Sequence, residues 1–493
     1  MKQILLIAIA ALLSCYGFSQ NRAMNWAFGD SAGLNFSTEP PLPFSTSIKT
    51  FEPSATISNE DGNLLFYTNG KTIWNAEHEP MLNGNFLDNG SGTLSSTTQG
   101  VIILPYPRDT NKYYVFHLDF NFLKYTVVDM SYEDGLGLVT SKNNIISEIP
   151  AITEKMHAVL HGNGRDWWLV VEALPEGGIF GLPFNFYEYL ITPDGINEPV
   201  IREGAIFEDQ DAIEQIGQMK FNQQGTMIAC TNGRSVILYN FDRCSGFLSA
   251  YYSIDSIFEG SDGDAVYGLE FSPNGNVLYV SKAGQGSIVR IYQYDLLAEN
   301  IKESQFIIYT YPGTGGVGSG GVTAGSFQLA LNNRIYITTS ITGPMANDSV
   351  DQNLNLTVIN YPNLLGEECS LDPTSIWLGG KKATVSLPNM PNYNLGVMEK
   401  SGCDTIGTTA INTFINNAIQ LYPNPAHNHI YLKQAPQGIV QIHIADIYGK
   451  EVLYFNQYST DVINISTLPS GLYFITITQE NAMLITQKLV VER

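Results

Sequence analysis

Charged side chains are scarce in this chain of 493 residues, and positive ones are scarcer still. Asp, Glu, Lys and Arg make up 15% of it, and 25 Lys and Arg stand against 47 Asp and Glu, for a formal net charge of −22. A surface of that sign repels phosphate backbones, so we expect no nucleic acid as a partner. Most of the Asp and Glu residues lie between residues 20 and 400, where their negative charge favours solubility.

Long apolar runs and helical periodicity are also missing. After residue 20 no stretch approaches the roughly eighteen uncharged apolar residues of a spanning helix, so no transmembrane span is expected. No long run repeats with a period of 3.6 residues, which argues against a helical core. The chain instead has short runs rich in aromatic and β-branched residues, bounded by Gly, Asn and Asp. This pattern predicts an all-β protein.

Cysteine is sparse, with five in the whole chain. Without Cys15, which lies in the N-terminal segment, four remain, an even number that suits an oxidising compartment. Three connectivities are open for Cys230, Cys244, Cys369 and Cys403. We expect a Cys369–Cys403 bridge, because these two bracket the end of the middle region. No pair has the CxxC spacing of a zinc site.

Catalytic motifs are absent as well. His157 and His161 are four residues apart, but no HExxH motif is present, and on a strand they would lie about 13 Å apart, too far for one ion. We expect His161 to have a structural hydrogen-bonding role at a hairpin. Residues 313–321 are rich in glycine but lack the Gly-Lys-Ser/Thr ending of a phosphate loop. The sequence thus predicts no catalytic residue, no metal ligand and no bound cofactor.

Two acidic clusters leave one exception open. Residues 208–211 and 259–264 each bring several carboxylates together, as a structural calcium site requires. Neither cluster matches an EF-hand loop or a glycine-aspartate repeat. Solvated loops are the expected interpretation, with structural calcium as the alternative.

The N-terminus has the pattern of a secretory signal peptide. Lys2 supplies a positive charge, residues 4–13 form an uninterrupted apolar run, and Gly17 and Ser19 are small residues before Gln20. We assign residues 1–19 to a signal peptide, which directs the chain to the periplasm. Cys15 also fits a lipoprotein cleavage box, so lipidation of this residue is the alternative.

Residues 20–400 repeat a phrase of about fifty residues, which is the length of a four-stranded propeller blade. Each phrase contains an apolar strand, a turn with Gly, Asn or Asp, and a second strand. The turns are marked by Gly62, Asn111, Gly164, Gly225, Gly275, Asn333 and Lys381. Seven marks predict a seven-bladed β-propeller, with six or eight blades as alternatives. We expect residues 25–28 to complete the final blade and close the ring.

The C-terminal residues carry an ordered set of short motifs. Tyr-Pro-Asn-Pro occupies residues 422–425, Asp-Ile-Tyr-Gly-Lys residues 446–450, and Leu-Pro-Ser-Gly-Leu-Tyr residues 468–473. Between them, Ile442 and Ile444 alternate with Gln441 and His443, the period of a strand with one buried face. Residues 418–493 therefore read as a small Ig-like β-sandwich, and residues 401–417 as a linker.

As a set, these motifs resemble the type A C-terminal sorting domain of proteins that Bacteroidetes bacteria export through the type IX secretion system (T9SS). The resemblance implies that the outer-membrane export machinery is a partner, and that the protein is secreted or displayed at the cell surface. The motif positions are Pro423, Asn424, Pro425, Gly449, Gly471, Tyr473 and Lys488.

The middle region resembles lactonase-like, TolB-like and WD40-like propellers through the Phe-Ser-Pro-Asn-Gly phrase at residues 271–275 and its flanking strands. It also resembles uncharacterised propeller regions that precede type A sorting domains. Two functions follow as hypotheses. One is a binding protein for an extracellular ligand, a glycan or a protein. The other is a lactonase-like or glycan-active hydrolase with its site in the propeller mouth.

Overall fold

The computed structural model describes most of the chain. The described residues are 21–87, 96–119, 122–175, 183–204, 215–258, 264–284, 289–311, 322–341, 350–403, 420–433, 440–446, 450–458, 462–479 and 482–492. They form two compact units, Met1–Ile406 and Gly407–Arg493. The expected signal peptide, the acidic cluster at 208–211 and the glycine-rich stretch lie outside the described residues, as does most of the expected linker and of the second acidic cluster.

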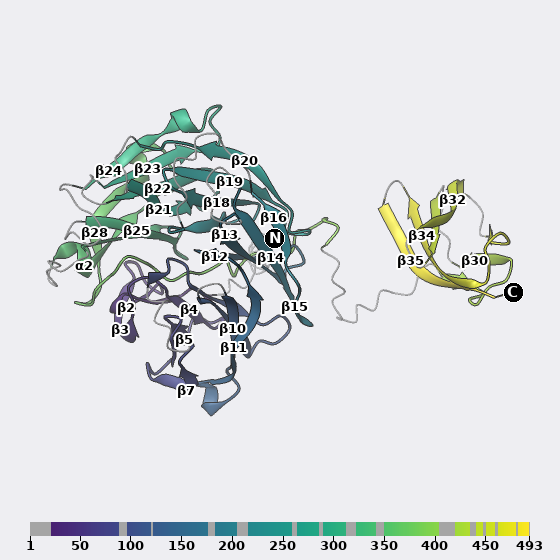
Figure 1. The fold of residues 1–493 in the computed structure, drawn as a ribbon, viewed down its shortest axis with the longest axis horizontal. Helices are drawn as coiled ribbons and strands as arrows, with labels where there is room; N and C mark the ends of the chain where they lie inside the picture. Colours follow the sequence, from purple (N-terminus) through teal and green to yellow (C-terminus); the bar gives the residue numbers. More distant parts are fainter. Residues whose placement is uncertain are drawn as a thin grey trace, which may run out of the picture. The chain divides into compact units, whose positions relative to one another are not determined.

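The first eleven strands of the N-terminal unit form two sheets (Figure 1). The first contains β1 (Asn25–Phe28), β2 (Asp30–Asn35) and β3 (Leu42–Lys49). The second has eight strands in two groups, joined by one parallel pair, Leu82 with Leu138. The groups are β4 (Ala55–Ser58), β5 (Leu64–Thr68), β6 (Thr72–Asn75) and β7 (Pro80–Asn85), then β8 (Val101–Pro105), β9 (Lys112–Asp119), β10 (Phe122–Asp129) and β11 (Leu138–Glu148).

The described part of the N-terminal unit contains four further sheets. The first has five strands: β12 (Ile152–Leu160), β13 (Trp167–Ala173), β14 (Asn185–Thr192), β15 (Gly195–Ile196) and β16 (Val200–Glu203). The next two have four strands each: β17 (Met219–Phe221), β18 (Met227–Asn232), β19 (Ser235–Phe241) and β20 (Leu248–Ile254), then β21 (Asp264–Phe271), β22 (Val277–Gly284), β23 (Arg290–Asp295) and β24 (Phe306–Thr310). The last contains β25 (Val322–Leu329), β26 (Ile335–Ile341), β27 (Asn355–Ile359) and β28 (Leu371–Trp377).

Helical structure is limited to single turns among the described residues. These are η2 (Glu133–Gly135), η4 (Lys302–Ser304), α2 (Asp351–Leu354) and η5 (Gly366–Cys369). The expected all-β class is confirmed. No helix in the described part of the chain is long and apolar enough to cross a membrane.

The repeated phrase corresponds to one recurring hairpin. Six of its seven marks lie in the turn between the first two strands of a group, as Gly275 does between β21 and β22. There the Ser272 amide donates to the Val277 carbonyl over 2.8 Å, and Gly275 has φ +75°, a left-handed conformation that glycine adopts without strain. The first strands β4, β8, β12, β17, β21 and β25 are consecutive neighbours, so they surround a common centre.

The expected role of residues 25–28 was wrong. They form β1, which pairs with β2 in the first sheet and does not join the last sheet. The end of the unit instead returns to the start, where the Asp30 amide donates to the Lys382 carbonyl over 2.9 Å. Side chains also connect the two ends, since the rings of Trp26 and Tyr336 lie 5.6 Å apart in one buried cluster. The contacts that close the N-terminal unit therefore come from the residues around Lys382, whereas the sequence pattern predicted them for residues 25–28.

The disulfide prediction was wrong in one partner. Cys403 is bonded to Cys244, with Cα atoms 5.5 Å apart, and the thiols of Cys230 and Cys369 are free and buried. Cys369 ends η5 and packs in a cluster with β22, β25 and β26, whereas the chain after β28 runs on to the turn between β19 and β20. Cys369 and Cys403 both lie near the last strands in the sequence, but they are not close to each other in space.

The C-terminal unit consists of a three-stranded and a four-stranded antiparallel sheet. The first contains β29 (Gln420–Tyr422), β30 (His429–Lys433) and β33 (Val462–Asn464); the second contains β31 (Val440–Asp446), β32 (Glu451–Tyr458), β34 (Gly471–Gln479) and β35 (Ala482–Val491). Ile442 and Ile444 are buried while Gln441 and His443 are not, as the alternation predicted. Their side chains pack in one core with Ile430, Ile463 and Ile475 from the neighbouring strands.

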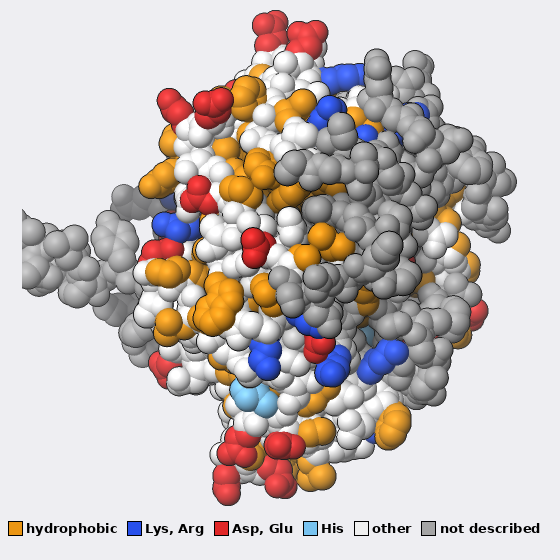
Figure 2. All heavy atoms as spheres, turned by 90° about the vertical axis from the view of Figure 1, so that its left-hand side faces the viewer, with side chains coloured by type: hydrophobic (Ala, Val, Ile, Leu, Met, Phe, Trp, Pro, Cys, Tyr) orange, Lys and Arg blue, Asp and Glu red, His pale blue; other side chains and the backbone are white. Residues whose placement is uncertain are grey.

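The surface of the N-terminal unit reflects the composition. Figure 2 shows a face on which hydrophobic side chains lie in separate spots among uncharged ones, and acidic side chains gather at opposite edges. Among the exposed hydrophobic residues are Leu42 in β3, Phe306 in β24 and Trp377 in β28, each on the last strand of its sheet.

Candidate functional site

The centre of the N-terminal unit is crossed by residues 382–403, which we call the closing segment. Its central residue is Asn389. The Asn389 side-chain amide donates to the carbonyl of Met156 in β12 over 2.9 Å and to that of Val101 in β8 over 3.3 Å. Its backbone amide donates to the Ser54 carbonyl over 2.8 Å. One residue thus joins three groups of strands, so the closing segment occupies the middle of the ring.

The far end of the closing segment is fixed on another part of the unit. The Tyr393 hydroxyl donates to the Ile103 carbonyl over 2.9 Å, and Arg243 donates to the Gly396 carbonyl over 2.7 Å. The Met398 amide then donates to the Gly162 carbonyl, and Cys403 ends the segment with its bond to Cys244. The path across the centre is therefore held along its whole length.

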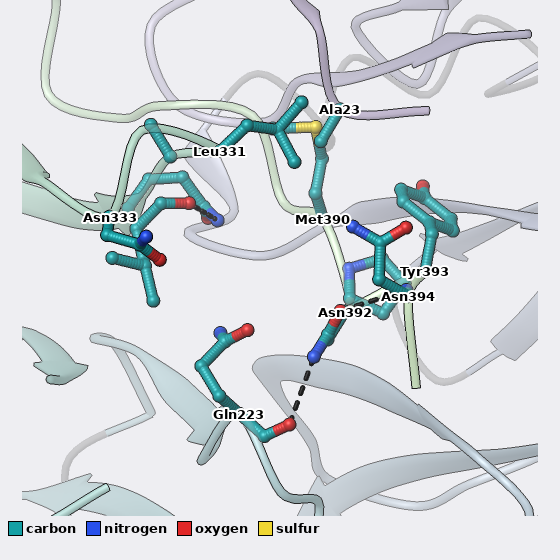
Figure 3. A pocket seen from close by; sticks show the side chains of 12 residues that line it. Ala23, Gln223, Leu331, Asn333, Met390, Asn392, Tyr393 and Asn394 are labelled. Atoms are coloured by element: carbon teal, nitrogen blue, oxygen red, sulfur yellow. Dashed lines mark hydrogen bonds between the residues drawn. The ribbon is translucent and has the colours of Figure 1, made fainter. Parts of the chain in front are cut away.

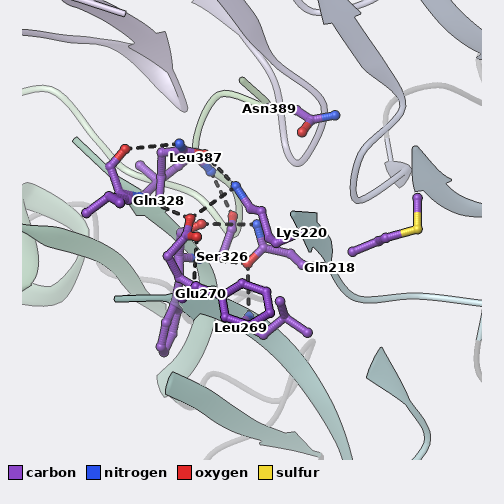
Figure 4. Close-up of polar contacts among 12 residues, drawn as sticks. Gln218, Lys220, Leu269, Glu270, Ser326, Gln328, Leu387 and Asn389 are labelled. Atoms are coloured by element: carbon purple, nitrogen blue, oxygen red, sulfur yellow. Dashed lines mark hydrogen bonds and ion pairs between the residues drawn. The ribbon is translucent and has the colours of Figure 1, made fainter. Parts of the chain in front are cut away.

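A buried charged cluster lies beside the closing segment (Figure 4). The Lys220 ammonium lies 3.5 Å from a Glu270 carboxylate oxygen and donates to the Gln328 side-chain oxygen over 2.5 Å. Burial lowers the pKa of Lys220 and raises that of Glu270, and the charge of each opposes the shift of the other. The Glu270 carboxylate also accepts the backbone amides of Phe271 and Leu329, both over 3.1 Å. These contacts come from β17, β21 and β25, so the cluster ties three sheets together.

His157 of β12 lies beside this charged cluster. Its side chain is 3% exposed and neither ring nitrogen has a hydrogen-bond partner among the described residues. Burial first, and the Lys220 charge second, lower its pKa well below the usual value, so the ring is neutral. His161 is different: its Nε2 lies 2.9 Å from the Cys244 carbonyl oxygen and its Nδ1 accepts the Asn163 amide. The expected structural role of His161 at a hairpin is confirmed.

A pocket of about 200 Å³ opens next to the charged cluster (Figure 3). Its wall consists of the turn after β17, the turn after β25 and the closing segment, and the side chain of Asn392 donates to the Gln223 carbonyl over 3.0 Å. The lining residues are Ala23, Gln223, Gln328, Leu329, Ala330, Leu331, Asn333, Met390, Pro391, Asn392, Tyr393 and Asn394.

The chemistry of this pocket is that of neutral amides on an apolar frame. Five of the lining residues are Asn or Gln, and none is Asp, Glu, His, Lys, Arg or Cys. The amide of Asn or Gln both donates and accepts hydrogen bonds, so it pairs with hydroxyl or amide groups of a ligand. In the part of the chain that is described, no group of three or more His, Cys, Asp or Glu is arranged to hold a metal ion.

The sorting-motif residues take up two kinds of position. Pro423, Asn424 and Pro425 are exposed, and the Asn424 side chain accepts the Val490 amide over 2.8 Å. Gly471 begins β34, and Tyr473 is buried with its hydroxyl donating to the Pro469 carbonyl over 3.0 Å. The Tyr473 contact fixes the turn that precedes β34. Gly449 lies outside the described residues, and Lys488 lies in β35.

Residues 420–492 match the family described as "Secretion system C-terminal sorting domain". The C-terminal unit is a type IX sorting domain. The predicted resemblance is confirmed for this part of the chain, and the sorting domain implies export through the type IX machinery to the cell surface or the medium. No curated protein matches the chain.

Solved structures similar to this chain include a protein without a stated function, a candidate lactonase and a β-propeller domain. A Lactobacillus plantarum protein has 12% identity and a TM-score of 0.42, covering 74% of this chain and 98% of its own. A candidate 6-phosphogluconolactonase from Bacteroides fragilis has 11% identity and a TM-score of 0.38, covering 76% and 99%. The Cps50 (Swd1) β-propeller domain of Myceliophteria thermophila has 10% identity and a TM-score of 0.34, covering 64% and 92%. These likenesses are too weak to transfer a function.

Sequence reasoning did not find the pocket. Gln223, next to the Gly225 mark, was part of a turn phrase, and residues 388–394 carried no motif. Their place in a pocket follows only from the contact of the closing segment with the turns after β17 and β25.

Proposed function

We propose that the N-terminal unit is a closed seven-bladed β-propeller that the sorting domain delivers to the cell surface or the medium. Support for seven blades comes from the seven strand groups, each of three to five strands, and from the aromatic packing between the first and last sheets. The two-sheet C-terminal unit supports an Ig-like sandwich. Residues 1–19 would act earlier, as the signal peptide for entry into the periplasm.

We further propose that the propeller binds an uncharged, hydroxyl-rich ligand, such as the end of a glycan, in the amide-lined pocket. The observation that carries this proposal is the lining itself: amides of Gln223, Asn392 and Asn394 beside apolar groups, without a carboxylate, imidazole, ammonium, guanidinium or thiol. Sugar hydroxyls donate and accept hydrogen bonds, as these amides do. At about 200 Å³ the pocket is smaller than the roughly 300–1,000 Å³ of common ligand sites, so it suits one terminal unit.

A glycan-array screen of the full chain tests this function. Gln223→Ala is the informative variant, because the hydrogen bond from Asn392 uses the Gln223 backbone carbonyl and survives the substitution. Gln224→Ala is the matched control, since that exposed side chain donates to the Pro273 carbonyl instead. We expect a glycan signal that Gln223→Ala removes and Gln224→Ala retains. Absence of any signal for the unsubstituted chain, or hydrolysis of the bound glycan, would reject a pure binding function.

A further inference from the structure

A groove of about 380 Å³ lies between two neighbouring groups of strands, where residues of β10, β11 and β15 line it together (Figure 1). One wall carries the side chains of Tyr106, Tyr114 and Tyr125, and the other consists of residues 195–199. The volume falls within the roughly 300–1,000 Å³ of common ligand sites, which the amide-lined pocket does not reach. The groove is therefore large enough to hold a ligand.

The strand register places two of the tyrosines on one face of their sheet. Tyr125 of β10 is paired with Phe116 of β9, two residues from Tyr114, and side chains two residues apart on a strand share a face. The rings of Tyr114 and Tyr125 meet edge to face with centroids 5.5 Å apart, and those of Tyr106 and Tyr114 are stacked at 4.7 Å. Tyr114 is 4% exposed, whereas Tyr106 and Tyr125 are half-buried. The buried ring thus supports two outer rings that line the groove.

The remaining lining groups are apolar or form hydrogen bonds, and one of them is charged. Ile145 of β11 is 60% exposed, and Asn197 and Glu198 on the opposite wall are exposed as well. The Asn197 backbone amide donates to the Leu190 carbonyl over 3.0 Å, which fixes this wall on β14. None of the described residues that line the groove is Lys, Arg or His, so an anionic ligand would meet the Glu198 carboxylate without a counter-charge. These groups suit an uncharged ligand that has both apolar faces and hydroxyls.

The groove lies near the amide-lined pocket. Both sites take a lining residue from the end of a first strand, since Tyr106 directly follows β8 and Gln223 comes two residues after β17. The hydroxyl of Tyr393, which lines the pocket, donates to the Ile103 carbonyl over 2.9 Å. Tyr106 is three residues further along the same strand, or about 10 Å at about 3.3 Å per residue. This separation is short enough for one extended ligand to occupy both sites.

We propose that the tyrosine-lined groove is a second subsite for the uncharged glycan whose end occupies the amide-lined pocket. Tyr106 and Tyr125 stack on the apolar faces of sugar rings, because an aromatic ring offers a large apolar surface. The Asn197 amide and the Glu198 carboxylate accept hydrogen bonds from sugar hydroxyls. The class of ligand rests on the proposed function, whereas the groove is a separate observation. The ligand is then a chain of several sugar units rather than a single one.

Equilibrium titration of the full chain with neutral glycans tests the proposal. The probes are the disaccharide and the hexasaccharide of the repeating unit that gives the strongest signal on a neutral-glycan array. We expect the hexasaccharide to bind about tenfold more tightly than the disaccharide, because only the longer probe reaches the rings. Tyr125→Ala should remove this difference and leave the disaccharide affinity unchanged. Tyr125→Phe should keep the difference, since it retains the ring.

Two further variants separate ligand contacts from folding. Asn197→Ala alters an exposed side chain, so the fold is retained, and it should weaken hexasaccharide binding about threefold or more through the loss of a hydrogen bond. Tyr132→Ala is the matched control, because Tyr132 is 48% exposed and does not line the groove. It should bind both probes as the unsubstituted chain does.

The outcomes separate this proposal from the proposed function. Weaker binding of both probes by Gln223→Ala, with hexasaccharide affinity unchanged in Tyr125→Ala and Asn197→Ala, would support the pocket and overturn the groove. Hexasaccharide binding that is insensitive to Gln223→Ala but weakened in Tyr125→Ala and Asn197→Ala would support the groove and reject the pocket. Displacement of the hexasaccharide by choline chloride would overturn the groove, because the rings and Glu198 would then hold a cation. Absence of any array signal would reject both.

Discussion

At the scale of single residues, the centre of the propeller contains charges that only their neighbours make tolerable. Lys220 is buried at 2% exposure and its ammonium contacts Glu270 and Gln328. Removing one member of a buried pair leaves an uncompensated charge, which typically costs about 3–5 kcal/mol. We therefore expect Lys220→Met to lower the free energy of unfolding by about that amount at neutral pH.

Chemical denaturation of Lys220→Met measures this cost. Burial already raises the pKa of Glu270, so acidification should protonate Glu270 and recover part of the loss. The double variant Lys220→Met with Glu270→Leu is the control, and it should be more stable than Lys220→Met alone. A double variant less stable than the single one would show that the pair itself holds the sheets together.

Glu154 gives a prediction for pH. Burial raises its folded-state pKa to about 7 from the usual 4.5, so the folded state binds the proton more tightly than the unfolded state does. The stability due to this proton is full below about pH 4.5 and is lost as pH rises through 7. The Tm of the unsubstituted chain should therefore fall across this window by more than the Tm of Glu154→Gln. Parallel curves for the two proteins would contradict the assignment.

At the scale of elements, the closing segment is a single extended stretch held at its end by a disulfide. The Cys244–Cys403 bond closes a loop with a sequence separation of 159 residues. Loss of a native disulfide typically costs about 2–5 kcal/mol, so we expect Cys403→Ser to lower stability by that amount. Cys244→Ser should lose as much, and the double variant no more, because both remove one bond. An additive loss in denaturant melts would mean that the cysteines act separately.

The sequence predicted those elements whose signal is local. The turn around Gly275 needs a left-handed residue, and the alternation around Ile442 needs one buried face, so both were visible in a few residues. The closing segment has no period, and the contacts near its end are with residues more than 150 positions away, such as Gly162 and Cys244. For the same reason neither the disulfide partner of Cys403 nor the pocket at Gln223 could be found before the fold was known.

At the scale of the whole molecule, the two units have different tasks. The sorting domain at residues 420–492 implies type IX export, and the propeller is the part left to act outside the cell. We expect deletion of residues 420–492 to retain the protein in the periplasm, because the export machinery no longer recognises it. Cell fractionation and immunoblotting measure this, with the unsubstituted chain as control. Equal amounts of both proteins at the surface or in the medium would contradict the assigned route.

The proposed ligand specificity remains the central claim, and an equilibrium titration of the full chain with the strongest glycan from the array tests it most directly. We expect saturable binding that is weakened about tenfold or more in Gln223→Ala, since loss of one well-formed hydrogen bond inside a pocket costs on the order of 1.4 kcal/mol. Gln224→Ala should bind as the unsubstituted chain does. Equal affinity of all three proteins would contradict the account, because the amide-lined pocket would then not be the site.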